Sequence, residues 1–120
     1  MKRLHVSFNV EDLDRSIAFY TQLFGTEPTV VREGYAKWLI DDPRMNFVIE
    51  ETAEAHGFTH AGLQTESEDE LNAVFDRMTT CCYHKSEKSW TADPDGVMWE
   101  AFFTHHQTED YGKAPEFAAK

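Results

Sequence analysis

The chain has 120 residues, of which 41% are hydrophobic, and a formal net charge of −11 at pH 7. This length and apolar content suit one compact domain with a modest core. Nucleic-acid binders concentrate Lys and Arg on one face, and the acidic chain has no basic stripe, which disfavours that class. No run of about 18 apolar residues predicts a membrane-spanning helix, and the opening residues lack the apolar segment of a secretion signal. We therefore expect a cytoplasmic protein.

The first half predicts a strand, a helix and three short strands. Residues 3–10 alternate apolar and polar side chains, which is typical of a half-buried strand. Apolar residues then recur at helical spacing from Ile17 to Phe24, and Gly25 follows as a stop signal. The three short strands are expected near 28–31, 35–40 and 46–50.

The second half repeats this order. "FTHAGLQTE" resembles the opening strand, and residues 67–78 predict a second amphipathic helix. Ser67 and Glu70 have the spacing of a capping box at its start. "DPDG" at 93–96 predicts a β-turn. Further strands are expected near 80–84, 88–92 and 97–103.

The predicted fold is α+β, with tandem βαβββ modules forming a curved, half-open mixed β-sheet cleft. We expect one domain over residues 1–104, with modules at about 1–52 and 57–104, because neither half is large enough to bury a good core alone. Residues 105–120 are polar without apolar periodicity and are expected to form a C-terminal tail.

Three residues suggest a metal centre. His5 and His60 occupy equivalent positions in the first strand of each half, and Glu100 shares a strand face with Met98 and Phe102. A carboxylate beside apolar side chains is unfavourable without a partner, which a divalent metal would supply. Two histidines and one carboxylate are typical of non-haem Fe(II) oxygenases and also of catalytic zinc sites. Ligand type alone leaves Fe(II), Zn(II), Ni(II) and Mn(II) open.

The simpler interpretation is that both histidines are ordinary half-exposed strand residues and that Glu100 pairs with a lysine. The repeated placement of the histidines together with the awkward acid favours the metal. Asn46 and Glu50 are weaker candidates for further ligands, because Val48 best matches Glu100 in the repeat.

The chain has two cysteines, Cys81 and Cys82, at adjacent positions. A disulfide between neighbours closes a very small ring and restricts the unfolded chain little. Burial as small apolar residues is the simpler alternative. If both thiols point into one cleft, residues 79–84 must form a loop or a distorted strand, since a regular strand sends neighbours to opposite faces. Nearby basic residues, including Lys88, would favour the thiolates.

"LHVSFNVEDLDRSIAFYTQLFG", "THAGLQ" and "DPDGVMWEAF" resemble the vicinal oxygen chelate superfamily, which includes glyoxalases, extradiol dioxygenases and bleomycin-resistance proteins. The resemblance covers about residues 1–104. It implies that His5, His60 and Glu100 are the metal ligands, and that the protein is a homodimer.

"YAKWLIDDPRMNFVI" and "TTCCYHKSEKSWTADPDGVMWE" resemble more closely the cadmium-induced proteins and the carbon–arsenic lyases. This resemblance implies that Cys81 and Cys82 bind a trivalent organoarsenical, and that Fe(II) with O2 breaks the C–As bond. Glu100 and Lys88 would then be catalytic, with Lys88 orienting the substrate. Some close lyases have Gln where this chain has His5. The alternatives are a non-catalytic Cd(II)- or As(III)-binding protein and another dioxygenase- or glyoxalase-type activity.

Overall fold

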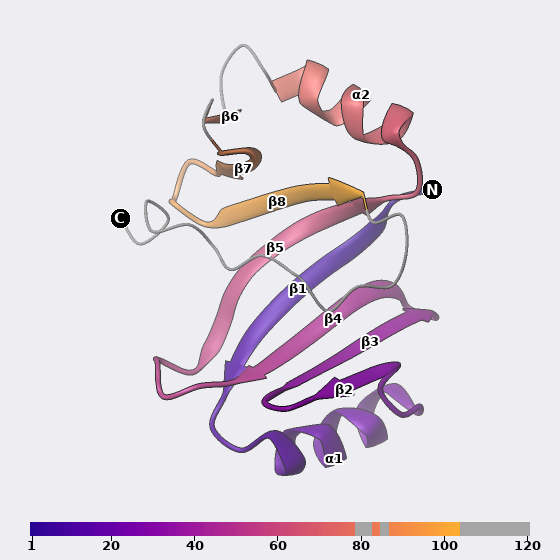
Figure 1. Cartoon of the computed structure of the whole chain (residues 1–120), viewed down its shortest axis with the longest axis vertical. Helices are drawn as coiled ribbons and strands as arrows, with labels where there is room; N and C mark the ends of the chain where they lie inside the picture. The colour runs from indigo at the N-terminus through magenta and orange to yellow at the C-terminus, as the bar shows by residue number, and fades with distance from the viewer. Residues whose placement is uncertain (79–82, 85–86, 104–120) are drawn as a thin grey trace. The chain divides into compact units, whose positions relative to one another are not determined.

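A computed structural model describes residues 1–78, 83–84 and 87–103 of the chain, shown in Figure 1. Two βαβββ sequences follow one another, which confirms the predicted α+β class and its tandem order. The elements are β1 (Arg3–Val10), α1 (Leu13–Phe24), β2 (Val30–Arg32), β3 (Tyr35–Asp41), β4 (Arg44–Glu51), β5 (Gly57–Thr65), α2 (Glu68–Met78), β6 (Tyr83–His84), β7 (Glu87–Ala92) and β8 (Met98–Phe103).

The described residues form two compact units, one of His5–Thr59 and the other of Met1–Leu4 with the described residues from His60 onward. In the first unit the strand order is β2-β3-β4-β1, with antiparallel pairing of β3 to both β2 and β4. In the second the order is β5-β8-β7-β6, with β5 and β8 parallel and the other pairs antiparallel. The strand pairing is therefore mixed, with β2 as an edge strand of the first unit and β6 as an edge strand of the second.

Helix α1 begins and ends where its capping residues dictate. The Asp12 carboxylate accepts a hydrogen bond from the Arg15 backbone N–H at 3.1 Å, which satisfies one of the free donors of the first turn. Gly25 ends the helix in the left-handed conformation, with φ of 77°, and its N–H donates to the Thr21 carbonyl at 2.9 Å. The predicted stop at Gly25 is confirmed.

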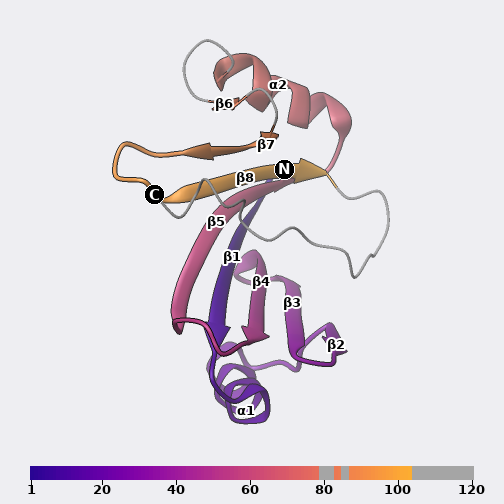
Figure 2. The same cartoon turned by 60° about the vertical axis from the view of Figure 1, so that its left-hand side comes forward.

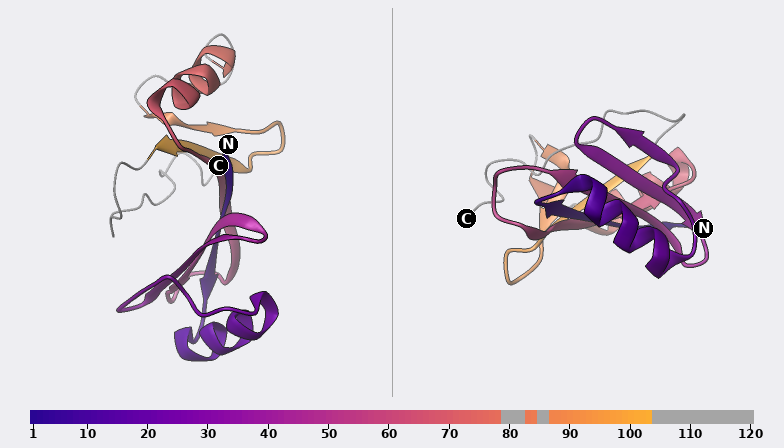
Figure 3. Two further views of the ribbon diagram at one scale, coloured as in Figure 1. Left: turned by 90° about the vertical axis from the view of Figure 1, so that its right-hand side faces the viewer. Right: turned by 90° about the horizontal axis from the view of Figure 1, so that it is seen from below.

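The core of the His5–Thr59 unit forms where α1 lies over one face of β3 and β4 (Figures 2 and 3). Alternate strand residues point to this face, as the two-residue period of a strand requires. The buried core residues are Leu13, Ala36, Trp38, Met45, Phe47 and Ile49. The Tyr20 and Phe24 rings of α1 pack on Trp38 and Phe47 with centroids 4.8–6.0 Å apart, in mostly tilted and edge-to-face geometry.

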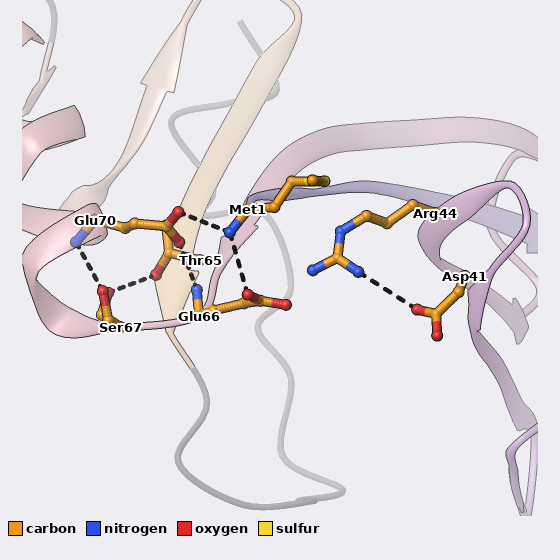
Figure 4. A network of polar contacts seen from close by, with 7 residues as sticks. All are labelled: Met1, Asp41, Arg44, Thr65, Glu66, Ser67 and Glu70. Atoms are coloured by element: carbon orange, nitrogen blue, oxygen red, sulfur yellow. Dashed lines mark hydrogen bonds and ion pairs between the residues drawn. The ribbon is translucent and has the colours of Figure 1, made fainter.

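Helix α2 belongs to the other unit and has a cap that differs in one detail from the predicted capping box. The Ser67 hydroxyl accepts from the Glu70 backbone N–H at 3.1 Å, as predicted. The Glu70 carboxylate, however, accepts from the backbone N–H of Glu66 at 2.8 Å, one residue before the expected partner (Figure 4). The same carboxylate also pairs with the Met1 amine at 3.1 Å.

The turn between β7 and β8 is confirmed. The Gly96 N–H donates to the Asp93 carbonyl at 2.9 Å, which closes a four-residue turn. The Asp93 carboxylate accepts from the backbone N–H groups of Asp95 and Val97 and holds the loop from inside. This turn delivers the chain into β8, the strand that carries Glu100.

Element boundaries shift slightly from the predicted ones. β4 begins at Arg44 rather than 46, since its antiparallel pairing with β3 extends to Asp41. β6 contains Tyr83 and His84, with a register shift between them, in line with a distorted strand at that end of 79–84. Residues 79–82 and the predicted tail at 105–120 lie outside the described residues. Neither α1 nor α2, with 12 and 11 residues, is a helix that could cross a membrane.

Replacing Ile49 with Ala should lower the free energy of unfolding by about 2–5 kcal/mol, because Ile49 is fully buried and leaves a cavity beneath α1. Urea denaturation followed by tryptophan fluorescence measures this. Leu23→Ala is the matched control on the outer face of α1, where 62% of the residue is exposed, and should change stability by no more than about 0.5 kcal/mol. Equal losses in the two variants would contradict this assignment of the core.

Candidate metal centre

His60 and Glu100 are brought together by the parallel pairing of β5 and β8, which lie side by side in Figures 1 and 2. The register pairs Gly62 with Glu100, and His60 lies two residues before Gly62 on β5. The side chains of His60 and Glu100 therefore start from diagonally neighbouring positions on the two strands. The His60 Nε2 atom lies 3.7 Å from Glu100 Oε1. Atoms that each bind one ion at about 2.0–2.2 Å are at most about 4.4 Å apart, so this spacing lets both share a metal.

The surroundings of the pair exclude most water. His60 is 4% exposed, and its ring packs edge-on against the ring of Trp90 with centroids 4.9 Å apart. Trp90 is the partner of Glu100 across the β7–β8 pairing, so it flanks both members of the pair. The Glu100 side chain is 14% exposed, and burial raises the pKa of its carboxyl to about 7.

The alternative that Glu100 pairs with a lysine finds no support among the described residues. Among these residues, the Glu100 carboxylate forms an ion pair with His60. An imidazole and a carboxyl that are both buried and close together are suited to bind a divalent cation, because the ion would favour the charged carboxylate that burial disfavours. The donor set therefore fits a metal.

Gly62 allows β5 and β8 to approach closely at this point. A Cβ atom at Gly62 would collide with the backbone carbonyl oxygen of Glu100 and lie 3.3 Å from the Glu100 Cβ. Only a residue without a side chain fits there, so Gly62 fixes how near the Glu100 backbone lies to β5. No sequence pattern singles out this glycine, since the contact depends on strand pairing.

His5 is held in one orientation by Asn46. Its Nδ1 atom lies 3.1 Å from the Asn46 backbone carbonyl oxygen and 3.2 Å from the Asn46 side-chain oxygen. A backbone carbonyl only accepts, so Nδ1 donates, and the Nε2 atom carries the lone pair that a metal ligand needs. Burial lowers the pKa of His5; the hydrogen bonds to Asn46 oppose this effect, and the charge of Lys37 adds to it.

Asn46 was expected as a weaker candidate for direct metal ligation, and the structure gives it a different contact. Both of its oxygens accept from the ring that would itself bind the metal, which is the usual role of a residue that orients a ligand. The sequence made Asn46 a candidate site residue, but it could not show that Asn46 contacts His5, because this contact depends on the fold.

The other predicted site residues are less fully described. His5 belongs to the His5–Thr59 unit, whereas His60 and Glu100 belong to the other unit. Lys88 lies on β7. Cys81 and Cys82 lie outside the described residues. The structure therefore joins His60 to Glu100 and His5 to Asn46, and the use of one metal by all three ligands is a proposal.

Residues 2–101 match the model of the Glyoxalase/Bleomycin resistance protein/Dioxygenase superfamily. The chain belongs to this superfamily. The superfamily resemblance noted in the sequence is thus confirmed.

The chain is similar to two curated relatives and, in fold, to one solved structure. The "Trivalent organoarsenical cleaving enzyme" of Bacillus sp. (strain MD1) is 39% identical over 96% of this chain and 81% of the relative. The "Cadmium-induced protein CadI" of Mycobacterium bovis is 31% identical over 96% of this chain and 84% of the relative. The Mn(II)-bound glyoxalase of Novosphingobium aromaticivorans is similar in fold, with a TM-score of 0.60 and 20% identity over 86% of this chain and 40% of that one.

Replacing Gly62 with Ala should weaken metal binding about 10- to 100-fold, the size of effect seen when residues that support ligands are changed. The new methyl group would force β8 and Glu100 away from His60. Competition with a chromophoric chelator, using Zn(II) as the probe, measures the affinity. Ala61→Gly is the neighbouring control, because it removes bulk at β5 without pushing on β8. Unchanged Zn(II) affinity in Gly62→Ala would contradict the role of this close approach.

The stability of the metal-free protein should fall as pH rises from 4.5 to about 7, relative to that of Glu100→Gln. The raised pKa means that the folded protein keeps a proton on Glu100 in this window while the unfolded chain has lost it. The full difference is roughly 3 kcal/mol and is complete above the folded pKa. Urea denaturation with a chelator present, at several pH values for both proteins, measures it. Parallel pH profiles would show that Glu100 ionises normally.

Proposed function

We propose that His5, His60 and Glu100 together bind one divalent metal, with Fe(II) as the physiological ion and Zn(II), Ni(II) or Mn(II) as ions that the same donors accept. Supporting this, two imidazoles and one carboxylate are a donor set that such ions accept in proteins.

Within the His5–Thr59 unit, β1 is in contact with the start of β5. The Thr59 hydroxyl donates to the Ser7 carbonyl at 3.1 Å, and the Phe8 and Phe58 rings meet edge-on at 5.9 Å. The start of β5 therefore lies beside β1. His5 lies on β1 two residues before Ser7, and His60 follows Thr59 in the sequence.

We propose that the protein cleaves the carbon–arsenic bond of trivalent organoarsenicals with O2. The observation that carries this is the 39% identity, over 96% of the chain, with a relative named for that activity. The buried imidazole–carboxyl pair supports the metal-dependent part, and the adjacent cysteines of the sequence support the arsenic-binding part.

In the proposed reaction the chain's own residues bind and orient the substrate. The thiols of Cys81 and Cys82 form two S–As bonds, and the arsenic-bound hydroxyls leave as water with the thiol protons. Lys88 orients the captured substrate. When bound, Fe(II) supplies one-electron chemistry with O2. Oxidation of the carbon then breaks its bond to arsenic. For a methyl group, CH3As(OH)2 and O2 give formaldehyde and arsenous acid, As(OH)3.

His60 and Glu100 also set the conditions for this chemistry. Trp90 covers the imidazole, and the burial of Glu100 limits the access of water to the reacting groups. Asn46 keeps the His5 ring in the tautomer whose Nε2 can bind a metal. The proposal further includes a homodimer in the cytoplasm, which sedimentation of the purified protein and fractionation of cells would test.

Protein loaded anaerobically with Fe(II) and given methylarsenite should release arsenite after air is admitted, as measured by chromatography coupled to arsenic detection. Cys81→Ser with Cys82→Ser should reduce kcat/KM by at least about 100-fold, since two covalent contacts to arsenic are lost. Glu100→Gln should abolish turnover while arsenic still binds the thiols. Ser16→Ala, on α1, is the surface control and should behave as wild type.

Three other results would each overturn part of this proposal. Tight As(III) or Cd(II) binding without arsenite release would favour the non-catalytic binder, the alternative prompted by the cadmium-induced relative. Turnover that survives the double cysteine variant would exclude capture by the thiols. Turnover of a ring-cleavage or glyoxalase substrate, with no effect on arsenicals, would assign the chain to another activity of the superfamily.

A further inference from the structure

Lys37 is a buried cation on the sheet face that also carries His5. It lies in the middle of β3 and is 9% exposed. Its neighbours Ala36 and Trp38 point into the core beneath α1, so the two-residue period sends Lys37 to the opposite face. The register pairs it with Val48 of β4, which also alternates away from the core residues Phe47 and Ile49.

The face around Lys37 is polar although it is buried. His5, Ser7 and Asn46 are each 4–5% exposed and also alternate away from the helix-covered core. The strand partner of Lys37, Val48, lies two residues along the same face of β4 from Asn46, which contacts His5. The charge of Lys37 also lowers the pKa of the His5 imidazole. This face is therefore built from groups that form hydrogen bonds and carry charge, and its single described lysine lies near a proposed metal ligand.

Within the described part of the chain, the Lys37 ammonium forms no hydrogen bond or ion pair. The nearest acid along β4 on this face is Glu50, two residues beyond the strand partner Val48, and no ion pair joins the two side chains. Removing an unpaired ammonium even partly from water is unfavourable, and burial accordingly lowers the pKa of Lys37. Protein cores seldom retain such a group unless it has a role.

We propose that Lys37 is a specificity-determining residue that binds an anionic substituent, such as a carboxylate, on the organic group of the substrate. The inference rests on the proposed function, because it assigns the substrate to the same site as His5. Thiol capture fixes the arsenic atom and leaves the organic group to be selected by the remaining surface. A lone buried cation close to His5 selects for a negative charge on that group.

The test compares two trivalent arsenicals that differ in one charge, phenylarsenite and 4-carboxyphenylarsenite, in the Fe(II)-loaded protein. In Lys37→Met the ratio of kcat/KM for the carboxylated over the plain substrate should fall at least tenfold, which corresponds to about 1.4 kcal/mol. Lys37→Arg keeps the charge and should retain most of the preference. Lys2→Met removes an exposed lysine and should leave the ratio unchanged.

A second arm needs neither arsenic nor turnover. Benzoate titrated into the metal-free protein by calorimetry should bind to wild type and lose at least tenfold affinity in Lys37→Met. Inorganic phosphate is titrated in parallel. If phosphate binds as well as benzoate and depends equally on Lys37, the residue binds any small anion and the assignment to the organic group is overturned.

The two proposals fail separately. If wild type cleaves neither arsenical, the proposed function fails while the benzoate titration still decides the role of Lys37. If benzoate affinity and the substrate ratio are both unchanged in Lys37→Met, Lys37 does not select substrates. An equal loss of kcat/KM for both arsenicals, with a lowered thermal midpoint, would assign Lys37 a structural role and overturn the proposal.

Discussion

The site depends on how closely β5 and β8 run beside each other. Gly62 provides the space, because any Cβ at this position would meet the backbone of Glu100. This contact fixes the position of the Glu100 backbone. The Glu100 carboxyl can then move relative to His60 only by rotation of its own side chain. The Asp93–Gly96 turn feeds β8 into this register, and Trp90 closes the other side of Glu100. A small backbone constraint thus determines where a buried acid and a buried imidazole meet.

Burial then gives the two groups their chemical character. An exposed glutamate beside an exposed histidine would be an ordinary surface pair with little effect on stability. Here the Glu100 side chain is largely removed from water, and its raised pKa reports the unfavourable charge. The same principle applies to Lys37 on its own sheet face, where a cation is held away from solvent. In both places the fold accepts an unfavourable buried charge at a position where a ligand would relieve it.

Much of the fold could be predicted from the sequence because its signals are local. The alternation of residues 3–10, the helical spacing before Gly25 and the "DPDG" turn each depend on a few neighbouring residues, and each is confirmed. His60 and Glu100 could be proposed as partners because repeat position and strand parity were readable. Gly62, the role of Asn46 and the isolation of Lys37 could not be found, since each depends on which strand lies alongside and in what register. The hydrogen bond between Glu70 and the backbone of Glu66 also escaped prediction. The same carboxylate pairs with Met1, which is distant in the sequence.

The two hydrogen bonds from His5 to Asn46 have a consequence for binding. An unrestrained imidazole must give up rotational freedom when it coordinates an ion, and that loss weakens the complex. In this protein the ring is already held when the chain folds, by two acceptor oxygens of Asn46 on β4. As the proposed metal ligand, His5 is therefore preorganised, because the entropy of ordering its ring is lost on folding and not on association. Asn46 would thereby link the folding of β4 to the affinity of the proposed metal site.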